Sequence, residues 1–511
     1  MRAVLATLAA GWLYGLAFPP TAAWWAAWIA LAPLIVVARG RGAWSAALAG
    51  ALYAVAGMSA TVDWLPHTVT VYYEQPIAVG FALFAVIALL MVVPPVAAFA
   101  ATVSAGAALP ASVRTLLVAA AWTAGELWRE HALGGNPWVL VGYSQVRTGL
   151  VAQVADLGGV FAVGFVVVVV NAAVAEIALA VRSRVPRRDG VVAAGVAACV
   201  VAATLAYGTW ALRHAAAADA TPVSVAVAQA DLDLGSQWRE EFYGRNLEAY
   251  LRLTHDALRA RPTRLVVWPE AAMTFFLADE RSYQSAIGRV LAPFGAELVT
   301  GGPYAVAGSS TTFRNAAFVL EPSGAVRGRY DKERLLPFAE YFPFPALDFL
   351  RRSFGRVREF GPGAPAPGPL STVAGRAGIL ICNEAMFAEV ARDRVRAGAE
   401  VLMVLTNDTW VGDAQFAGIA FDMAVLRAIE TRRWLVRAST AGPSAIVAPS
   451  GEVRTASAFG SAATVTGDVA PRAGLTVYVR FGDVFAWACV VATAAALAHA
   501  FRRRDRRRRA A

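Results

Sequence analysis

The 511-residue sequence contains almost no lysine. Of its 46 basic residues, one, Lys332, is a lysine and the rest are arginines. Lysine and arginine differ in hydration, in geometry and in how readily their pKa shifts. Because arginine supplies positive charge everywhere else, we expect Lys332 to have a role that a guanidinium cannot fill. A surface lysine without a function is the alternative.

Cysteine and histidine are scarce too. Cys199 and Cys489 lie in apolar stretches, so Cys382 is the only cysteine of region 214–483 and no disulfide can form within it. None of the five histidines forms an H-x-x-x-H pair, and the chain has neither a Walker motif nor a dinucleotide-binding glycine motif. The sequence therefore predicts no metal and no cofactor.

Charged residues are also few. They make up 16% of the chain against 58% hydrophobic residues, and the mean hydropathy is +0.51. This composition excludes an ordinary soluble protein. Runs of about 17 or more apolar residues can cross a bilayer core. The stronger runs are 22–38, 43–60, 77–106, 158–181, 190–212 and 484–501, and the weaker ones are 3–17 and 112–128. We expect a membrane protein with about eight transmembrane α-helices.

The arginines indicate how these helices are oriented. With eight spans and an internal N-terminus, the basic clusters all fall on one side, which the positive-inside rule assigns to the cytoplasm. These clusters contain Arg2, Arg39, Arg41, Arg114, Arg182, Arg184, Arg187, Arg188, Arg502 to Arg504 and Arg506 to Arg509. Nucleic-acid binding by the Arg-rich tail is the alternative, but we expect no nucleic-acid partner, because a topology anchor explains the net charge of +10.

Three regions follow from this topology: residues 1–213 with seven spans, an external domain at 214–483, and residues 484–511 with the last span and the tail. In the external domain, short apolar runs alternate with the helical patterns 237–260 and 416–432. The runs are 223–229, 264–268, 297–300, 315–320, 377–382, 400–406, 434–438 and 444–449. This alternation predicts an α/β domain with buried strands.

Three side chains of this domain carry reactive chemistry. Glu270 follows a predicted strand and Pro269, and Cys382 ends another strand. Ligands of open α/β sheets gather beyond the carboxyl ends of the strands. A thiolate becomes a strong nucleophile when a base or a cation is nearby, and Glu270 and Lys332 would supply both. A solvated loop carboxylate and a buried structural thiol are the alternative interpretations.

The order Glu270, Lys332, Cys382 resembles the nitrilase (carbon–nitrogen hydrolase) superfamily. Over essentially its whole length, the chain resembles the apolipoprotein N-acyltransferase family, which joins an eight-span membrane region to an external nitrilase-like domain, an αββα sandwich. Further segments that resemble this family are Phe18-Pro19-Pro20, Trp24-Trp25, Ala32-Pro33, Glu126-Leu127-Trp128-Arg129, Asn136-Pro137-Trp138, Gln229, Trp238, Pro337-Phe338-Ala339-Glu340, Asn407-Asp408-Thr409-Trp410 and Arg427-Ala428-Ile429-Glu430.

The resemblance also implies supporting or substrate-binding residues. Besides the catalytic Glu270, Lys332 and Cys382, these are Glu340, Glu384, Trp238, Asn383 and Trp410. The chain departs from the family pattern at three positions. Asn383 replaces an aromatic residue, Val411 a phenylalanine and Ala420 a histidine. These changes bear on the shape of the pocket and on acyl-chain preference.

The activity that the resemblance implies is a two-step acyl transfer. Cys382 takes a fatty acyl chain from the sn-1 position of a phospholipid, with Glu270 as base and Lys332 stabilising the oxyanion. The thioester then acylates the α-amino group of the N-terminal diacylglyceryl-cysteine of an apolipoprotein. The expected partners are therefore the phospholipid donor, the apolipoprotein acceptor and the lipid bilayer.

The expected location is the bacterial cytoplasmic (inner) membrane, with a multi-pass topology and the catalytic domain on the extracytoplasmic, periplasmic side. Two other functions stay open on the sequence alone. A membrane-tethered amidase of the nitrilase type would use the same three residues and pass the acyl group to water. An inactive scaffold or a transporter would use none of them.

Overall fold

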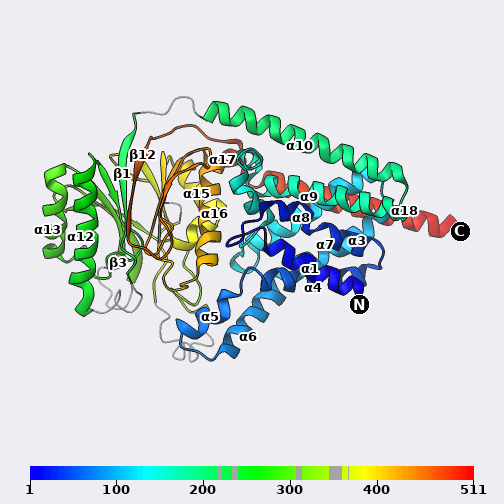
Figure 1. The fold of residues 1–511 in the computed structure, drawn as a ribbon, viewed down its shortest axis with the longest axis horizontal. Coiled ribbons are helices and arrows are strands. Elements are labelled where there is room, and N and C mark those ends of the chain that lie inside the picture. Colours follow the sequence, from blue (N-terminus) through cyan, green and yellow to red (C-terminus); the bar gives the residue numbers. More distant parts are fainter. Residues whose placement is uncertain (216–220, 233–239, 307–312, 344–358, 366, 511) are drawn as a thin grey trace. The chain divides into compact units, whose positions relative to one another are not determined.

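The computed structural model describes residues 1–215, 221–232, 240–306, 313–343, 359–365 and 367–510 (Figure 1). Packing divides the chain into two compact units. The helical unit comprises Met1–His67, Ile77–His214 and Phe481–Ala511, and the sandwich unit comprises Thr68–Pro76 and Ala215–Arg480.

Each apolar run of the sequence coincides with helical structure in the helical unit. The main helices are α1 (Arg2–Gly15), α3 (Ala32–Arg39), α4 (Ala43–Ser59), α5 (Trp64–Val71), α6 (Ile77–Ile87), α7 (Val93–Ala105), α8 (Ala111–His131), α9 (Ala155–Val181), α10 (Arg187–Ala215) and α18 (Val484–Ala510). Within the described residues, four helical stretches are long and apolar enough to cross a membrane, or five if the bent pair α4 and α5 forms one span. The predicted apolar helical region is confirmed, and the number eight stays a prediction.

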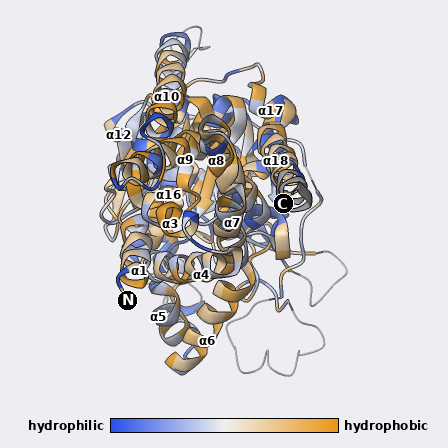
Figure 2. Cartoon of the chain, turned by 90° about the vertical axis from the view of Figure 1, so that its right-hand side faces the viewer, coloured by the Kyte–Doolittle hydropathy of each residue, from blue (hydrophilic) through white to orange (hydrophobic). Residues whose placement is uncertain are grey.

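The helices of this unit, including α6 and α9, consist largely of hydrophobic residues (Figure 2). Small residues let the helices approach closely, as is common where helices pack in lipid. A Cβ atom at Gly11 of α1 would lie 2.6 Å from the Tyr53 carbonyl oxygen of α4, and one at Gly50 would lie 2.5 Å from the Val96 carbonyl oxygen of α7. Any larger residue at either glycine would force the two helices apart.

The sandwich unit contains two six-stranded sheets. The first has the order β12 (Ala463–Val469), β1 (Val223–Gln229), β2 (Leu265–Val267), β3 (Glu297–Ala305), β4 (Phe313–Leu320) and β5 (Val326–Asp331). The second has the order β11 (Val453–Ala456), β10 (Ala445–Val447), β9 (Trp434–Ser439), β8 (Val401–Thr406), β7 (Gly375–Ile381) and β6 (Leu370–Thr372). Strands β1 to β3 are parallel, as are β7 to β9. The other pairs are antiparallel.

The two sheets face each other across an apolar core that contains Val227, Val267, Ile381 and Met403. A second core joins the outer face of the first sheet to α12 (Tyr243–Ala260) and α13 (Arg281–Leu291). Helices α15 (Ala388–Arg396) and α16 (Ala414–Thr431) pack against the second sheet. Figure 1 shows the resulting four layers of helices and strands. This arrangement confirms the predicted αββα sandwich.

Candidate active site

Three strands of the sandwich unit end next to the residues singled out by sequence. Glu270 lies three residues beyond β2, while Lys332 directly follows β5 and Cys382 directly follows β7. The Lys332 Nζ atom lies 3.7 Å from Glu270 Oε1. The charges of Glu270 and Lys332 both act on the Cys382 thiol. The fold therefore gathers the three residues from strands of both sheets.

Lys332 is almost completely buried, with 1% of its surface exposed. Its Nζ atom lies 2.7 Å from Glu340 Oε2. Burial by itself lowers the pKa of an ammonium group, but the carboxylates of Glu340 and Glu270 outweigh burial here and raise the pKa of Lys332 above its usual value. The ammonium is therefore charged at neutral pH and is held in place by two acidic partners.

Asn315 of β4 joins these two carboxylates. Its Nδ2 atom donates to Glu270 Oε1 and to Glu340 Oε1, each at 2.7 Å. The Lys332 backbone N–H donates to the Asn315 carbonyl oxygen at 2.8 Å. Asn315 thus supports all three charged groups, although the sequence analysis missed it. Its only sequence signal is an amide at the start of the apolar run 315–320.

Glu270 is buried in a tight loop. Its Oε2 atom accepts a hydrogen bond from the Asn407 backbone N–H at 2.9 Å. A Cβ atom at Gly301 of β3 would lie 2.7 Å from Glu270 Cα, so only glycine leaves room for the loop. Burial raises the pKa of the Glu270 carboxyl above its usual value, while the Lys332 charge lowers it and the Glu340 charge raises it. A carboxylate with a raised pKa is a better proton acceptor.

Cys382 lies at a sharp turn between β7 and a 3-10 turn (Cys382–Met386). Its φ of 52° is left-handed, a conformation that costs energy for a residue with a side chain. Burial raises the pKa of the thiol, and the Glu270 charge raises it further while the Lys332 charge lowers it. The resting group is therefore a thiol that needs a base before it can attack.

Glu384 ties the cysteine turn to the lysine loop. Its Oε2 atom accepts from the Ile381 backbone N–H at 2.7 Å. Its Oε1 atom accepts from the Tyr330 hydroxyl at 2.7 Å and from the backbone N–H groups of Glu333 and Arg334 at 2.9 and 3.1 Å. These four bonds hold a buried carboxylate between the two segments, which fixes Cys382 relative to Lys332.

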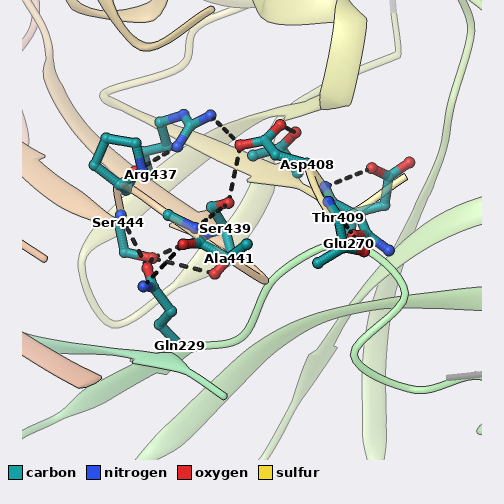
Figure 3. A network of polar contacts seen from close by, with 12 residues as sticks. Gln229, Glu270, Asp408, Thr409, Arg437, Ser439, Ala441 and Ser444 are labelled. Atoms are coloured by element: carbon teal, nitrogen blue, oxygen red, sulfur yellow. Dashed lines mark hydrogen bonds and ion pairs between the residues drawn. The ribbon is translucent and has the colours of Figure 1, made fainter. Parts of the chain in front are cut away.

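A polar network fixes the loops that follow β8 and β9 (Figure 3). Asp408 Oδ2 accepts from Arg437 at 2.7 Å and from the Ser439 hydroxyl at 3.0 Å. At the end of β1, Gln229 accepts from the Ser444 hydroxyl at 2.8 Å and donates to the Ala441 carbonyl oxygen at 3.2 Å. The network therefore supports Asn407, the residue that holds Glu270.

Where the structure describes them, the other residues that the sequence analysis named make no hydrogen bond or ion pair to Glu270, Lys332 or Cys382. Asn383 is buried beside the nucleophile, and its Oδ1 atom has no hydrogen-bond partner within the described residues. Trp410 is half-buried, with its ring edge-to-face to Phe416 at 6.0 Å between centroids. Val411 and Ala420 are buried. Trp238 lies outside the described residues. In the part of the chain that is described, no group of three or more His, Cys, Asp or Glu side chains could hold a metal ion.

Comparison with known proteins covers both halves of the chain. Residues 10–173 match the family described as apolipoprotein N-acyltransferase N-terminal domain, and residues 224–475 match the carbon–nitrogen hydrolase family. A carbon–nitrogen hydrolase structure from Helicobacter pylori G27 is 18% identical, with a TM-score of 0.38, over 49% of this chain and 89% of that one.

Two curated relatives span nearly the full length. The apolipoprotein N-acyltransferase of Geobacter metallireducens is 33% identical over 99% of this chain and 96% of its own. That of Methylococcus capsulatus is 29% identical over 99% of this chain and 97% of its own. With this identity over both units, and with the nitrilase-like sandwich attached to a region of apolar helices, the chain belongs to the apolipoprotein N-acyltransferase family.

Proposed function

We propose that the protein transfers a fatty acyl chain from the sn-1 position of a phospholipid, through a Cys382 thioester, to the α-amino group of the N-terminal diacylglyceryl-cysteine of apolipoproteins. One observation carries the proposal: a half-buried thiol at a strained turn shares its surroundings with the buried Glu270–Lys332–Glu340 cluster. The full-length relatives named apolipoprotein N-acyltransferase support an acyl transfer to nitrogen with an apolipoprotein as the acceptor.

In the first half-reaction, Glu270 takes the thiol proton and Cys382 Sγ attacks the sn-1 ester carbonyl. Lys332 stabilises the negative charge that develops on the carbonyl oxygen, and its fixed position means that little reorganisation is needed at that moment. The tetrahedral intermediate collapses to the thioester. The proton held by Glu270 goes to the departing alkoxide, which leaves as a lysophospholipid.

In the second half-reaction, the α-amine of the diacylglyceryl-cysteine attacks the thioester carbonyl. Glu270 takes a proton from the amine nitrogen, and Lys332 again stabilises the oxyanion. The C–S bond breaks as the amide forms, and the thiolate recovers its proton from Glu270. All protons are exchanged among these groups, so the reaction needs neither a metal nor a cofactor.

We further propose that the chain spans the bacterial inner membrane eight times, with residues 214–483 on the periplasmic side. The one-sided arginines support this orientation. Tryptophan favours both membrane interfaces, and exposed tryptophans lie near the ends of the proposed spans. Trp24, Trp25, Trp128, Trp210 and Trp487 lie near external ends, and Trp44 lies near a cytoplasmic end. This topology puts the donor, the acceptor and the thiol on the same side of the bilayer.

Intact-mass measurement of the purified protein tests the proposed reaction. Phospholipid alone should add one fatty acyl chain to Cys382, because a two-step reaction stalls at the covalent intermediate when the second substrate is missing. The adduct should be sensitive to hydroxylamine, and Cys382→Ala should abolish it. Adding a diacylglyceryl lipopeptide should discharge the adduct and yield the N-acylated peptide.

Two other outcomes would contradict the proposal. An adduct that hydrolyses equally fast with and without lipopeptide would make the protein an amidase-type hydrolase. If no phospholipid produced an adduct on a folded protein, the role of Cys382 as nucleophile would be wrong.

A further inference from the structure

A short segment of the sandwich unit comes from within the sequence of the helical unit. Residues Thr68–Pro76 pack with the sandwich, whereas their neighbours on both sides, Met1–His67 and Ile77–His214, belong to the helical unit. The segment runs from the last residues of α5 to the start of α6. It carries two adjacent aromatic residues, Tyr72 and Tyr73, whose rings meet edge-to-face at 4.8 Å between centroids.

Tyr73 holds the loop that contains Glu340. Its hydroxyl donates to the Phe338 carbonyl oxygen at 2.9 Å. Phe338 has a left-handed φ of 65°, so its peptide needs external support. Two residues later, Glu340 Oε2 accepts from the Leu336 backbone N–H at 2.7 Å and contacts Lys332. A shift of this peptide would therefore move one of the two carboxylates of the site.

Tyr72 holds the loop that contains Asn407. Its ring lies edge-to-face against Trp410, with 5.9 Å between centroids. Such aromatic pairs stabilise a structure beyond the area that they bury. Three residues before Trp410, the Asn407 backbone N–H donates to Glu270 Oε2. The second carboxylate of the site thus depends on the loop that Tyr72 contacts.

We propose that Tyr72 and Tyr73 are positioning residues for the acyl transfer, fixing Glu270 and Glu340 on either side of the Lys332 ammonium. The inference rests on the proposed function. Neither tyrosine takes part in a bond-making step. Each acts through a loop, and the segment Thr68–Pro76 makes the charge arrangement around Cys382 depend on residues outside the contiguous sandwich sequence.

Two variants separate these contacts. Tyr73→Phe keeps the ring and removes the hydrogen bond to Phe338, and Tyr72→Leu removes the ring that contacts Trp410. Tyr207→Phe is the matched control, because its hydroxyl makes a similar bond, 2.8 Å to Asp156 Oδ1, within the helical unit. Each variant is purified as the full chain and compared by thermal unfolding before its activity is measured.

The expected result is a roughly three- to tenfold slower single-turnover acylation of Cys382 by phospholipid in each tyrosine variant, the range for losing one such contact. In Tyr73→Phe, the KM for phospholipid and the unfolding temperature should stay close to those of the unmodified protein. Tyr207→Phe should acylate at the normal rate.

Alkylation of the peptide that contains Cys382, followed against pH, gives a second readout that a purely structural role would not change. The charged groups acting on this thiol are Glu270, Lys332, Asp408 and Glu340. Glu270 and Glu340 raise the pKa of the Cys382 thiol in the intact site. If the variants hold these carboxylates less firmly, the pH at which alkylation reaches half its maximal rate should fall.

Normal acylation and an unchanged alkylation profile in Tyr73→Phe would overturn the inference, and this variant decides the question if Tyr72→Leu does not fold. The proposed function fails separately, since it fails when the unmodified protein forms no thioester. The alkylation profile needs no lipid substrate and would still test the positioning role in that case.

Discussion

Lys332 keeps its charge inside the sandwich because two carboxylates lie against its ammonium. Removing an ammonium from water costs several kcal/mol, and removing one partner of a buried pair typically costs about 3–5 kcal/mol. Glu340 lies closer to the ammonium than Glu270 does, at 2.7 Å against 3.7 Å. Glu340 is therefore the main counterion, which leaves Glu270 freer to exchange a proton with the thiol.

Replacing this lysine by the residue that carries nearly all other positive charge in the chain tests whether its shape matters. Lys332→Arg should lower the rate of acyl transfer by roughly 10²-fold or more, the scale of losing one oxyanion donor. A guanidinium is larger and planar, so it would displace Glu270 or Glu340 and present its charge at a different place. Single-turnover kinetics with phospholipid measure the loss.

The control for this variant is Arg261→Lys, which makes the reverse exchange in an exposed ion pair with Asp468. Its activity should be normal, because exposed ion pairs contribute little. Near-normal turnover of Lys332→Arg would refute a special role for the ammonium.

At the scale of elements, α15 links strands of both sheets through one buried arginine. Arg394 is 1% exposed. Its Nε atom donates to the Ile379 carbonyl oxygen of β7 at 3.1 Å, and its Nη2 atom donates to the Tyr330 hydroxyl of β5 at 2.7 Å. These two strands lead directly to Cys382 and Lys332. Arg394 therefore supports Tyr330, which in turn donates to Glu384.

Removing this arginine should destabilise the sandwich. Arg394→Met should lower the free energy of unfolding by about 3 kcal/mol or more, because it removes two buried hydrogen bonds of a charged group, to the Ile379 carbonyl oxygen and to the Tyr330 hydroxyl. Denaturant unfolding followed by tryptophan fluorescence measures the change. Arg376→Met is the control, since it removes an exposed pair with Glu400 and should cost about 1 kcal/mol or less. Equal losses in the two variants would contradict the linking role.

The sequence predicted the buried, apolar strands and missed the strands at the sheet edges. Buried strands such as β1 and β8 are nearly continuous apolar runs and stand out in the sequence. Strand β5 reads Val-Arg-Gly-Arg-Tyr-Asp at a sheet edge, where alternate side chains meet solvent, and gives no such signal. The edge strands β6, β11 and β12 were not predicted for the same reason, and the helices α13 and α15 were not predicted because they are short. In the sequence, a short edge strand with polar residues cannot be told from a loop.

The residues of the site also fall into those that the sequence could predict and those that it could not. Glu270, Lys332 and Cys382 could be named because unusual residue types stand at strand ends in an order that resembles a known superfamily. Asn315 and Arg394 could not be named, because an amide or a guanidinium in a strand or a short polar helix resembles ordinary surface. Their importance comes from long-range contacts, such as Asn315 with Glu270 or Arg394 with Tyr330, which only the folded chain reveals.

For the whole molecule, cysteine labelling tests the proposed orientation in the membrane. An engineered cysteine at the exposed Ser282 of α13 should react with a membrane-impermeant thiol probe on sealed spheroplasts. An engineered cysteine at Ala510 should react only after the membrane is opened, because the Arg-rich tail is expected in the cytoplasm. Labelling of the tail in sealed cells would reverse the proposed topology.

The burial of a solitary lysine has a further consequence for proteolysis. A protease specific for lysine has one bond to cut in the entire chain, the peptide between Lys332 and Glu333. The folded sandwich hides this bond's lysine side chain. The fragments 1–332 and 333–511 should therefore arise only from molecules whose sandwich has opened. The amount of these two fragments on a gel would then measure local unfolding of the sandwich, even while the apolar helices stay embedded in lipid.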